Sequence, residues 1–389
     1  MPGPPSSATA RLTRRRTPKP TPVSESLYQA CTWSFGRCNS RAIYDAPKRA
    51  IAVLSPMLTQ YLRQRPAGDI FVRLTLNDRI TDKLTPHQSE AFGKEPLLFR
   101  HQAHKLPLFS DDALAELIER TPRENYYVNT MKRGAKDRSS RREGEIRGLS
   151  GRDVLDAVAK GHIWIMLLYP EKAVPGYGQL LEQIYGEIRE NVPGMQILKK
   201  KISILISSPN IPVFYHCDLA GQTLWQVRGE KTVYVYPSHE PYLPQPNLEK
   251  IVLNEAHEIS LPYDEAWDKV ASSYTIKPGD MLNWQLYAPH RIQNGNCMNV
   301  SFTTEHVTPV VRRNYAVNFA NGILRRTIGL DKLGQSIAGP SYWSKMATVA
   351  AAKALRLQKG REQVFKIDFA VDLAAPDCVR DIPVYQHQR

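Results

Sequence analysis

The chain has 389 residues, and its 52 Lys and Arg residues against 38 Asp and Glu residues give a formal net charge of +14. It contains no run of the ~18–20 apolar residues that a membrane-spanning helix requires, and its N-terminus lacks the apolar segment of a secretory signal. Its five cysteines are scattered and include no CxxC pair, which excludes a disulfide framework and a structural zinc site and favours a cytoplasmic location.

The positive charge is concentrated in two segments, residues 11–19 and residues 132–147. We expect both to be solvated stretches, and the alternative for the second is an acidic partner or substrate beside it. No aromatic residues interleave with either segment, so a base-stacking surface for nucleic acid is not indicated. Attraction to nucleic acid would then be non-specific and would depend on salt.

Two regions precede the first dense run of strands. Residues 1–25 are rich in Pro, Ser, Thr and Arg, and we expect a disordered basic tail there. Residues 26–194 are expected to form a helical and mixed region that supports the core. Its predicted elements are a strand at 69–76, a helix between Ser110 and Pro122, a helix at 151–160, a strand at 162–169 and a helix at 178–191.

The pattern changes from helical to strand-like after Pro193. Seven or more short segments rich in β-branched or aromatic residues follow within about a hundred residues, which is typical of a sandwich or a barrel. One further helix is expected at 341–358. The sequence therefore predicts an α+β protein with a mainly β core at 195–310 and a C-terminal helical extension at 311–389, which would be a lid or a dimer contact.

His216 and Asp218 lie two residues apart in the segment FYHCDLAG. Residues i and i+2 of a strand point to the same face, so both side chains can reach one metal ion. Cys217, between them, should point to the opposite face and is not expected to be a ligand. Two His and one carboxylate form the facial triad of non-haem Fe(II) oxygenases, which leaves coordination positions open for a co-substrate and oxygen.

Later segments supply a second His and a possible anion partner. Lys231 interrupts an apolar strand and needs an anionic partner if it faces inward, whereas an outward-facing Lys on an edge strand is ordinary. His290 follows a Pro-Gly-Asp turn and would reach the mouth of a barrel. Asn299, Ser301 and Thr303 share one face of a strand, where small polar groups can hydrogen-bond a bound carboxylate or face solvent.

These segments together resemble the JmjC and cupin-like 2-oxoglutarate oxygenases, especially the branch that contains the asparaginyl hydroxylase of hypoxia-inducible factor, and bacterial cupin-like proteins. The shared parts are the H-x-D motif, a Q-V-R-G-E-K turn, a G-D-M-L segment, a distal His and a V-S-F strand. Lys231 follows Asp218 by thirteen residues and His290 follows Asp280 by ten, as in that branch. The resemblance covers residues 195–305 and implies a double-stranded β-helix, the jelly-roll of the cupins.

The resemblance also implies roles for individual residues. His216, Asp218 and His290 would be the catalytic metal ligands, with Fe(II) as the metal and with 2-oxoglutarate and O2 as co-substrates. Lys231 would pair with the C5 carboxylate of 2-oxoglutarate. Val213 stands where relatives often have a Thr, so the hydroxyl partner of that carboxylate would come from elsewhere. The co-substrate contacts expected on this basis are Lys231, Gln222, Ser301, Thr303 and Tyr215, with Ser203 as a further candidate.

The expected activity is hydroxylation, because halogenases of the wider superfamily leave the position of Asp218 open for chloride. The substrate would be an amino-acid-like small molecule or a side chain of a peptide or protein, and a homodimer is possible. The alternative is a metal-binding cupin without oxygenase activity, an isomerase or a sensor, which would not need Lys231. Trp284 is expected in the core or the site wall. The remaining His residues near the barrel, expected to be at the surface or structural, are His239, His257 and His306.

Overall fold

The computed structural model describes residues 78–135, 138–355, 357 and 364–388. All of the described residues belong to one unit of the chain. The tail expected at 1–25 and the strand expected at 69–76 lie outside the described residues. Within the described ranges, no helix is both long enough and apolar enough to cross a membrane.

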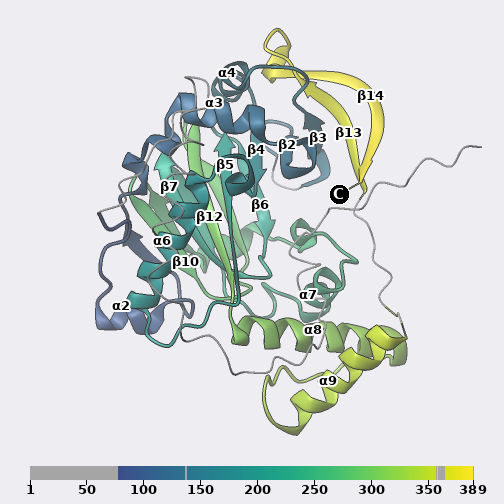
Figure 1. Ribbon diagram of the computed structural model, residues 1–389. Coiled ribbons are helices and arrows are strands. Elements are labelled where there is room, and N and C mark those ends of the chain that lie inside the picture. The colour runs from purple at the N-terminus through teal and green to yellow at the C-terminus, as the bar shows by residue number, and fades with distance from the viewer. Residues whose placement is uncertain (1–77, 136–137, 356, 358–363, 389) are drawn as a thin grey trace, which may run out of the picture. The chain divides into compact units, whose positions relative to one another are not determined.

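The described chain is a mixed α+β structure built on two sheets (Figure 1). Neighbouring strands are antiparallel except for the parallel pair β3 and β13. The smaller sheet has the order β6 (Pro212–His216), β11 (His290–Asn294), β8 (Lys231–Val235) and β9 (Ser272–Ile276). The larger sheet has the order β1 (Leu97–Arg100), β10 (Asp280–Trp284), β7 (Gly221–Arg228), β12 (Asn299–Val307), β5 (Lys199–Ser207), β4 (Ile163–Leu168), β2 (Tyr126–Thr130), β3 (Arg142–Glu145), β13 (Val364–Val371) and β14 (Val379–Gln388).

The strands of the expected barrel region are divided between the two sheets. β10, β7, β12 and β5 are neighbours in the larger sheet, and β6, β11, β8 and β9 form the whole of the smaller one. One apolar cluster joins their facing sides, with Leu224 and Leu282 from the larger sheet and Val233 and Ile292 from the smaller. Side chains alternate between the faces of a strand, so every second residue of these strands points into the space between the sheets.

Three helices cover the outer face of the larger sheet. They belong to the same apolar cluster as Trp225 and Phe302, which stack with ring centroids 5.2 Å apart. The first helix begins where the sequence predicts, because the Ser110 hydroxyl accepts a hydrogen bond from the Ala113 N–H at 3.2 Å. The third starts two residues before its predicted start. Their bounds are α3 (Asp111–Arg120), α4 (Gly151–Lys160) and α6 (Gly176–Asn191).

The C-terminal region contains more than the expected helix. That helix is present as α9 (Gly339–Ala354), but α8 (Pro309–Ile328) precedes it, and β13 and β14 form a hairpin that extends the larger sheet. Sequence periodicity misses α8 because its buried residues include a continuous run from Val317 to Ile323 instead of one face. The other α-helices of the described ranges are α2 (Pro86–Ala91), α5 (Pro170–Ala173) and α7 (Gln245–Val252).

Part of the second basic segment attaches this hairpin to the sheet. Arg142 Nε lies 2.9 Å from Asp368, and a terminal nitrogen of the same guanidinium lies 2.6 Å from Asp381. Arg133 pairs with Asp377 at 2.5 Å. These two cations therefore have partners within the chain, and an external acidic partner is not needed to explain them.

Candidate metal centre

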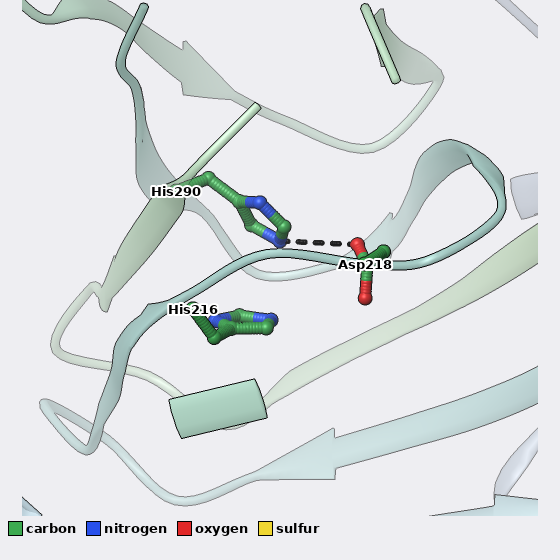
Figure 2. A group of neighbouring side chains, drawn as sticks. All are labelled: His216, Asp218 and His290. Carbon is green, nitrogen blue, oxygen red and sulfur yellow. Dashed lines mark ion pairs between the residues drawn. The ribbon is translucent and has the colours of Figure 1, made fainter. Parts of the chain in front are cut away.

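Three potential metal ligands meet at adjacent ends of β6 and β11. His216 is the last residue of β6, His290 is the first of β11, and the two are direct antiparallel partners. Asp218 lies just beyond β6, so a loop and not the strand itself carries the carboxylate. The three side chains point toward one another (Figure 2), and one ligand atom from each lies within 4.8 Å of the others. Among the described residues, no other group of three or more His, Cys, Asp or Glu side chains is close enough to hold a metal ion.

Backbone carbonyls orient both imidazole rings. His216 Nδ1 lies 2.7 Å from the Phe214 carbonyl, and His290 Nδ1 lies 3.0 Å from the Ala288 carbonyl. A carbonyl oxygen only accepts, so each Nδ1 donates its proton there, and Nε2 is the nitrogen that each ring has left to face a metal. Burial, with His216 beside it, lowers the pKa of His290 well below its usual value, so this ring is neutral. Both rings are thus prepared to bind a metal through Nε2.

Asp218 completes the donor set. Its Oδ2 atom is buried, has no hydrogen-bond partner in the described structure, and lies 3.4 Å from His290 Nε2 (dashed line in Figure 2). Burial raises the pKa of Asp218, and the nearby His216 and Lys201 oppose that rise. A buried carboxylate without a donor is costly, and a cation would remove that cost. Two imidazole nitrogens and one carboxylate oxygen suit Fe(II), and also Mn(II) or Zn(II).

Lys231 points inward from the first position of β8. Its side chain shares the inner face of that strand with Val233 and Val235, and only 3% of the residue is exposed. Nζ donates a hydrogen bond to Ser301 Oγ at 2.9 Å, and among the described residues no carboxylate contributes to the pKa of Lys231. Burial lowers its pKa to about 7. The edge-strand alternative is excluded, because β8 lies between β11 and β9.

Several other expected co-substrate residues lie on the facing wall. Ser301 and Thr303 belong to the inner face of β12, and Thr303 is the direct partner of Ser203 on β5. Gln222, at the start of β7, is 7% exposed. Three buried oxygen atoms here have no hydrogen-bond partner in the described structure: Thr303 Oγ1, Ser203 Oγ and Gln222 Oε1. Unsatisfied polar atoms inside a protein point to a missing ligand or water.

Tyr215 is not brought to this group. It precedes His216 on β6 and therefore points to the opposite face. Its hydroxyl donates to the Tyr242 carbonyl at 2.8 Å, and its ring lies 4.9 Å from that of Tyr236. Cys217 is fully buried in the apolar cluster that contains Tyr215 and Tyr236, on the face opposite His216, as the alternation of strand residues predicts.

Sequence reasoning missed an ion pair near the metal ligands. Lys201 Nζ lies 2.8 Å from Glu305 Oε1, and the two side chains are 14% and 10% exposed. The signal was available, because the alternation through Ser301 and Thr303 continues to Glu305. Lys201 is the last of three consecutive lysines, a run that is typical of a solvated strand end, so the sequence does not single it out.

Among the described residues, none of the other histidines near the barrel belongs to the group formed by His216, Asp218 and His290. His306 is 6% exposed and lies on the other face of β12, with Nδ1 3.3 Å from the Tyr185 hydroxyl. His239 is exposed. The His257 side chain caps a short helical turn by accepting from the Ile259 N–H at 3.3 Å. These placements agree with the expectation of surface or structural roles.

No family model and no curated protein sequence matches this chain. Among solved structures, it resembles YcfD, a ribosomal oxygenase from Escherichia coli, in complex with cobalt and 2-oxoglutarate, at 15% identity over 73% of this chain and 69% of that one, with a TM-score of 0.42. The same protein with cobalt and succinic acid matches at 15% identity over 76% of each chain, with a TM-score of 0.41. A DMSP lyase structure matches 28% of this chain and 40% of that one, at 10% identity and a TM-score of 0.19.

Proposed function

We propose that the chain is an Fe(II)- and 2-oxoglutarate-dependent oxygenase of the JmjC and cupin-like type, acting as a hydroxylase. The observation that carries the proposal is a buried cation without an anion. Lys231 faces the same inter-sheet space as His216, Asp218 and His290, and a metal site with a separate anion site suits a co-substrate that binds both.

The strand order supports a double-stranded β-helix. Along the chain, β5, β7, β10 and β12 go to one sheet and β6, β8, β9 and β11 to the other. Eight strands in two facing antiparallel sheets of four are the arrangement of a jelly-roll. In this assignment, β1, β4, β2, β3 and the C-terminal hairpin are additions to the edges of one sheet.

The residues divide the binding of 2-oxoglutarate between two ends. His216, Asp218 and His290 would hold iron, which when bound supplies oxygen activation coupled to oxidative decarboxylation of 2-oxoglutarate to succinate. Lys231 lies four residues from Val235, the β8 partner of His290, or about 13 Å along the strand. A lysine side chain covers part of that span, and the rest suits a short dicarboxylate.

The polar wall would complete the anion site. Ser301 already accepts from Lys231 and would orient the ammonium, while Thr303 and Ser203 have hydroxyls free to donate to a carboxylate. Gln222 would lie near the metal end of the co-substrate. Asp218, as a third protein ligand, favours hydroxylation over halogenation. The substrate would be an amino-acid-like small molecule or a side chain of a peptide or protein. The second possibility has a counterpart in YcfD, which is described as a ribosomal oxygenase.

Succinate formation tests this proposal. We expect Fe(II)-loaded protein to convert 2-oxoglutarate slowly to succinate without added substrate, and Asp218→Ala to form none. Lys231→Ala should raise the KM for 2-oxoglutarate about 10- to 100-fold, because a charge-assisted hydrogen bond contributes about 1.5–3 kcal/mol. Lys277→Ala, which removes an ammonium that is 65% exposed, is the matched control and should behave as wild type.

A protein that binds iron but neither binds nor consumes 2-oxoglutarate would instead be a metal-binding cupin without oxygenase activity. The inward-facing Lys231 argues against that alternative, since such a protein has no need of a buried ammonium beside its metal.

A further inference from the structure

A row of four side chains crosses the larger sheet opposite the metal ligands. Trp284 on β10, Gln222 on β7, Glu305 on β12 and Lys201 on β5 are successive cross-strand partners. Directly paired residues share a face, so all four point into the space between the sheets. The Trp284 ring lies 4.6 Å from that of His290, centroid to centroid, which places that end of the row beside the candidate metal centre. At the other end, Lys201 lies close enough to Asp218 to oppose the rise in its pKa, and Asp218 in turn helps to raise the pKa of Glu305.

A contribution to stability does not explain the ion pair that Lys201 and Glu305 form in this row. Lys201 and Glu305 are both largely buried, and replacing a buried ion pair with apolar residues is often neutral or stabilising. The next lysine on β5 gives a contrast. Lys200 points to the other face and pairs at 2.6 Å with Glu182, which is 68% exposed, as an ordinary surface pair does.

The row also lacks partners that a ligand would supply. Gln222 is 7% exposed, and its Oε1 atom has no hydrogen-bond partner in the described structure. The contact with Glu305 uses one of the three N–H donors of Lys201, and the carboxylate of Glu305 has two oxygens with room for further donors. Donors and acceptors of opposite charge therefore stand side by side next to the metal ligands.

We propose that Lys201 and Glu305 bind the charged head of a free α-amino acid substrate, whose ammonium donates to Glu305 and whose carboxylate accepts from Lys201. The inference rests on the proposed function and narrows its substrate. A ligand with one charge would satisfy one member of the pair and compete with the other, whereas a zwitterion matches both. A residue inside a peptide has neutral amides at these positions, so it would not compensate two desolvated charges.

Equilibrium binding tests the inference without turnover. The full chain, loaded with Fe(II) and 2-oxoglutarate and kept free of oxygen, is titrated calorimetrically with each of the twenty free L-amino acids. We expect at least one to bind. Its Nα-acetyl amide, which keeps the side chain and removes both head charges, should bind at least about 30-fold more weakly, as expected when a buried charge loses its partner.

The variants separate recognition from folding. Glu305→Gln should weaken the amino acid by about 30-fold or more. The double variant Lys201→Met/Glu305→Met should fold, because apolar pairs replace buried ion pairs well, and should lose the binding as well. Lys200→Gln changes the same charge on the opposite face of β5 and should bind as wild type does.

Each contrary result has a distinct meaning. If 2-oxoglutarate binds but no free amino acid does, or if the double variant binds the amino acid as tightly as wild type, the inference is overturned and the oxygenase proposal stands. Equal binding of the free amino acid and its acetyl amide also overturns it and favours a peptide substrate. If 2-oxoglutarate itself does not bind, the proposed function fails first.

Discussion

At Lys231, burial and charge oppose each other. The side chain is enclosed by an apolar strand and by Ser301, and its ammonium is stabilised by one hydrogen bond instead of an anion. Burial therefore lowers its pKa to about 7, so near neutral pH the free protein is a mixture of protonated and neutral Lys231. A bound carboxylate favours the protonated form and raises that pKa.

This coupling predicts a pH dependence of 2-oxoglutarate binding. Below the free pKa of about 7, Lys231 is already protonated and affinity should vary little from this cause. Above it, binding must take up a proton, so the dissociation constant should rise about tenfold per pH unit until the pKa of the complex is reached. Titrations at several pH values, without oxygen, measure this slope. Lys231→Arg stays protonated and should flatten it, and an unchanged slope in that variant would assign the effect to another group.

For single residues, the sequence predicts part of the candidate site and misses the contacts that depend on strand register. Spacing and residue type predict His216, Asp218 and His290 as metal ligands, and the structure brings these three side chains together. The sequence also predicts a co-substrate contact at Tyr215, but strand alternation turns this side chain to the opposite face. Lys201 and Glu305 belong to strands separated by about a hundred residues, and only the register of β5 against β12 makes them neighbours.

At the scale of elements, α3 and α4 could be predicted because their signals are local. A capping Ser and one apolar face define each of them. The hairpin of β13 and β14 could not be predicted in its place, because β13 pairs with β3, a strand more than two hundred residues earlier in the sequence. The close packing of α3 against α4 requires a residue without a side chain at one position, and the sequence does not predict this requirement. A Cβ atom on Gly151 would lie 2.1 Å from the Ala115 carbonyl oxygen.

Gly151→Ala should therefore destabilise the protein. The clash is with backbone, so the two helices must separate, at a cost of about 1–3 kcal/mol in the free energy of unfolding. Urea unfolding measures the change. Gly186→Ala is the matched control, since a Cβ atom on Gly186 in α6 would meet nothing within 4 Å, and it should gain about 0.5–1 kcal/mol from helix propensity. Equal effects of both changes would mean that the close approach is not required.

At the scale of the whole molecule, metal binding and folding should be linked. A ligand that binds only the folded state stabilises it by about 2.7 kcal/mol when present at a hundred times its dissociation constant. Chelation of the metal should therefore lower the melting temperature of wild type and leave that of His290→Ala unchanged. His239→Ala, which removes an exposed His, should respond as wild type does. A metal effect that persists in His290→Ala would place the ion elsewhere.

The oligomeric state stays a prediction at this scale. Trp343 on α9 is 70% exposed and Leu355, just after the helix, is 69% exposed. We expect these side chains to contribute to a homodimer contact, so Trp343→Ser should shift the protein toward monomer in sedimentation experiments. A wild type that is already monomeric at all concentrations would favour the lid alternative for this region.

The pairing of His216 with His290 also bears on the stage of folding at which the candidate metal centre forms. The strands β7, β8, β9 and β10 lie between these two residues in the chain, so the pairing of β6 with β11 closes a long loop. Contacts between distant segments form late in folding, because the loops that they close are long. We therefore expect the two imidazole rings to meet late in folding. A nascent or misfolded chain would not assemble this ligand set, and capture of the ion would mark completion of the fold.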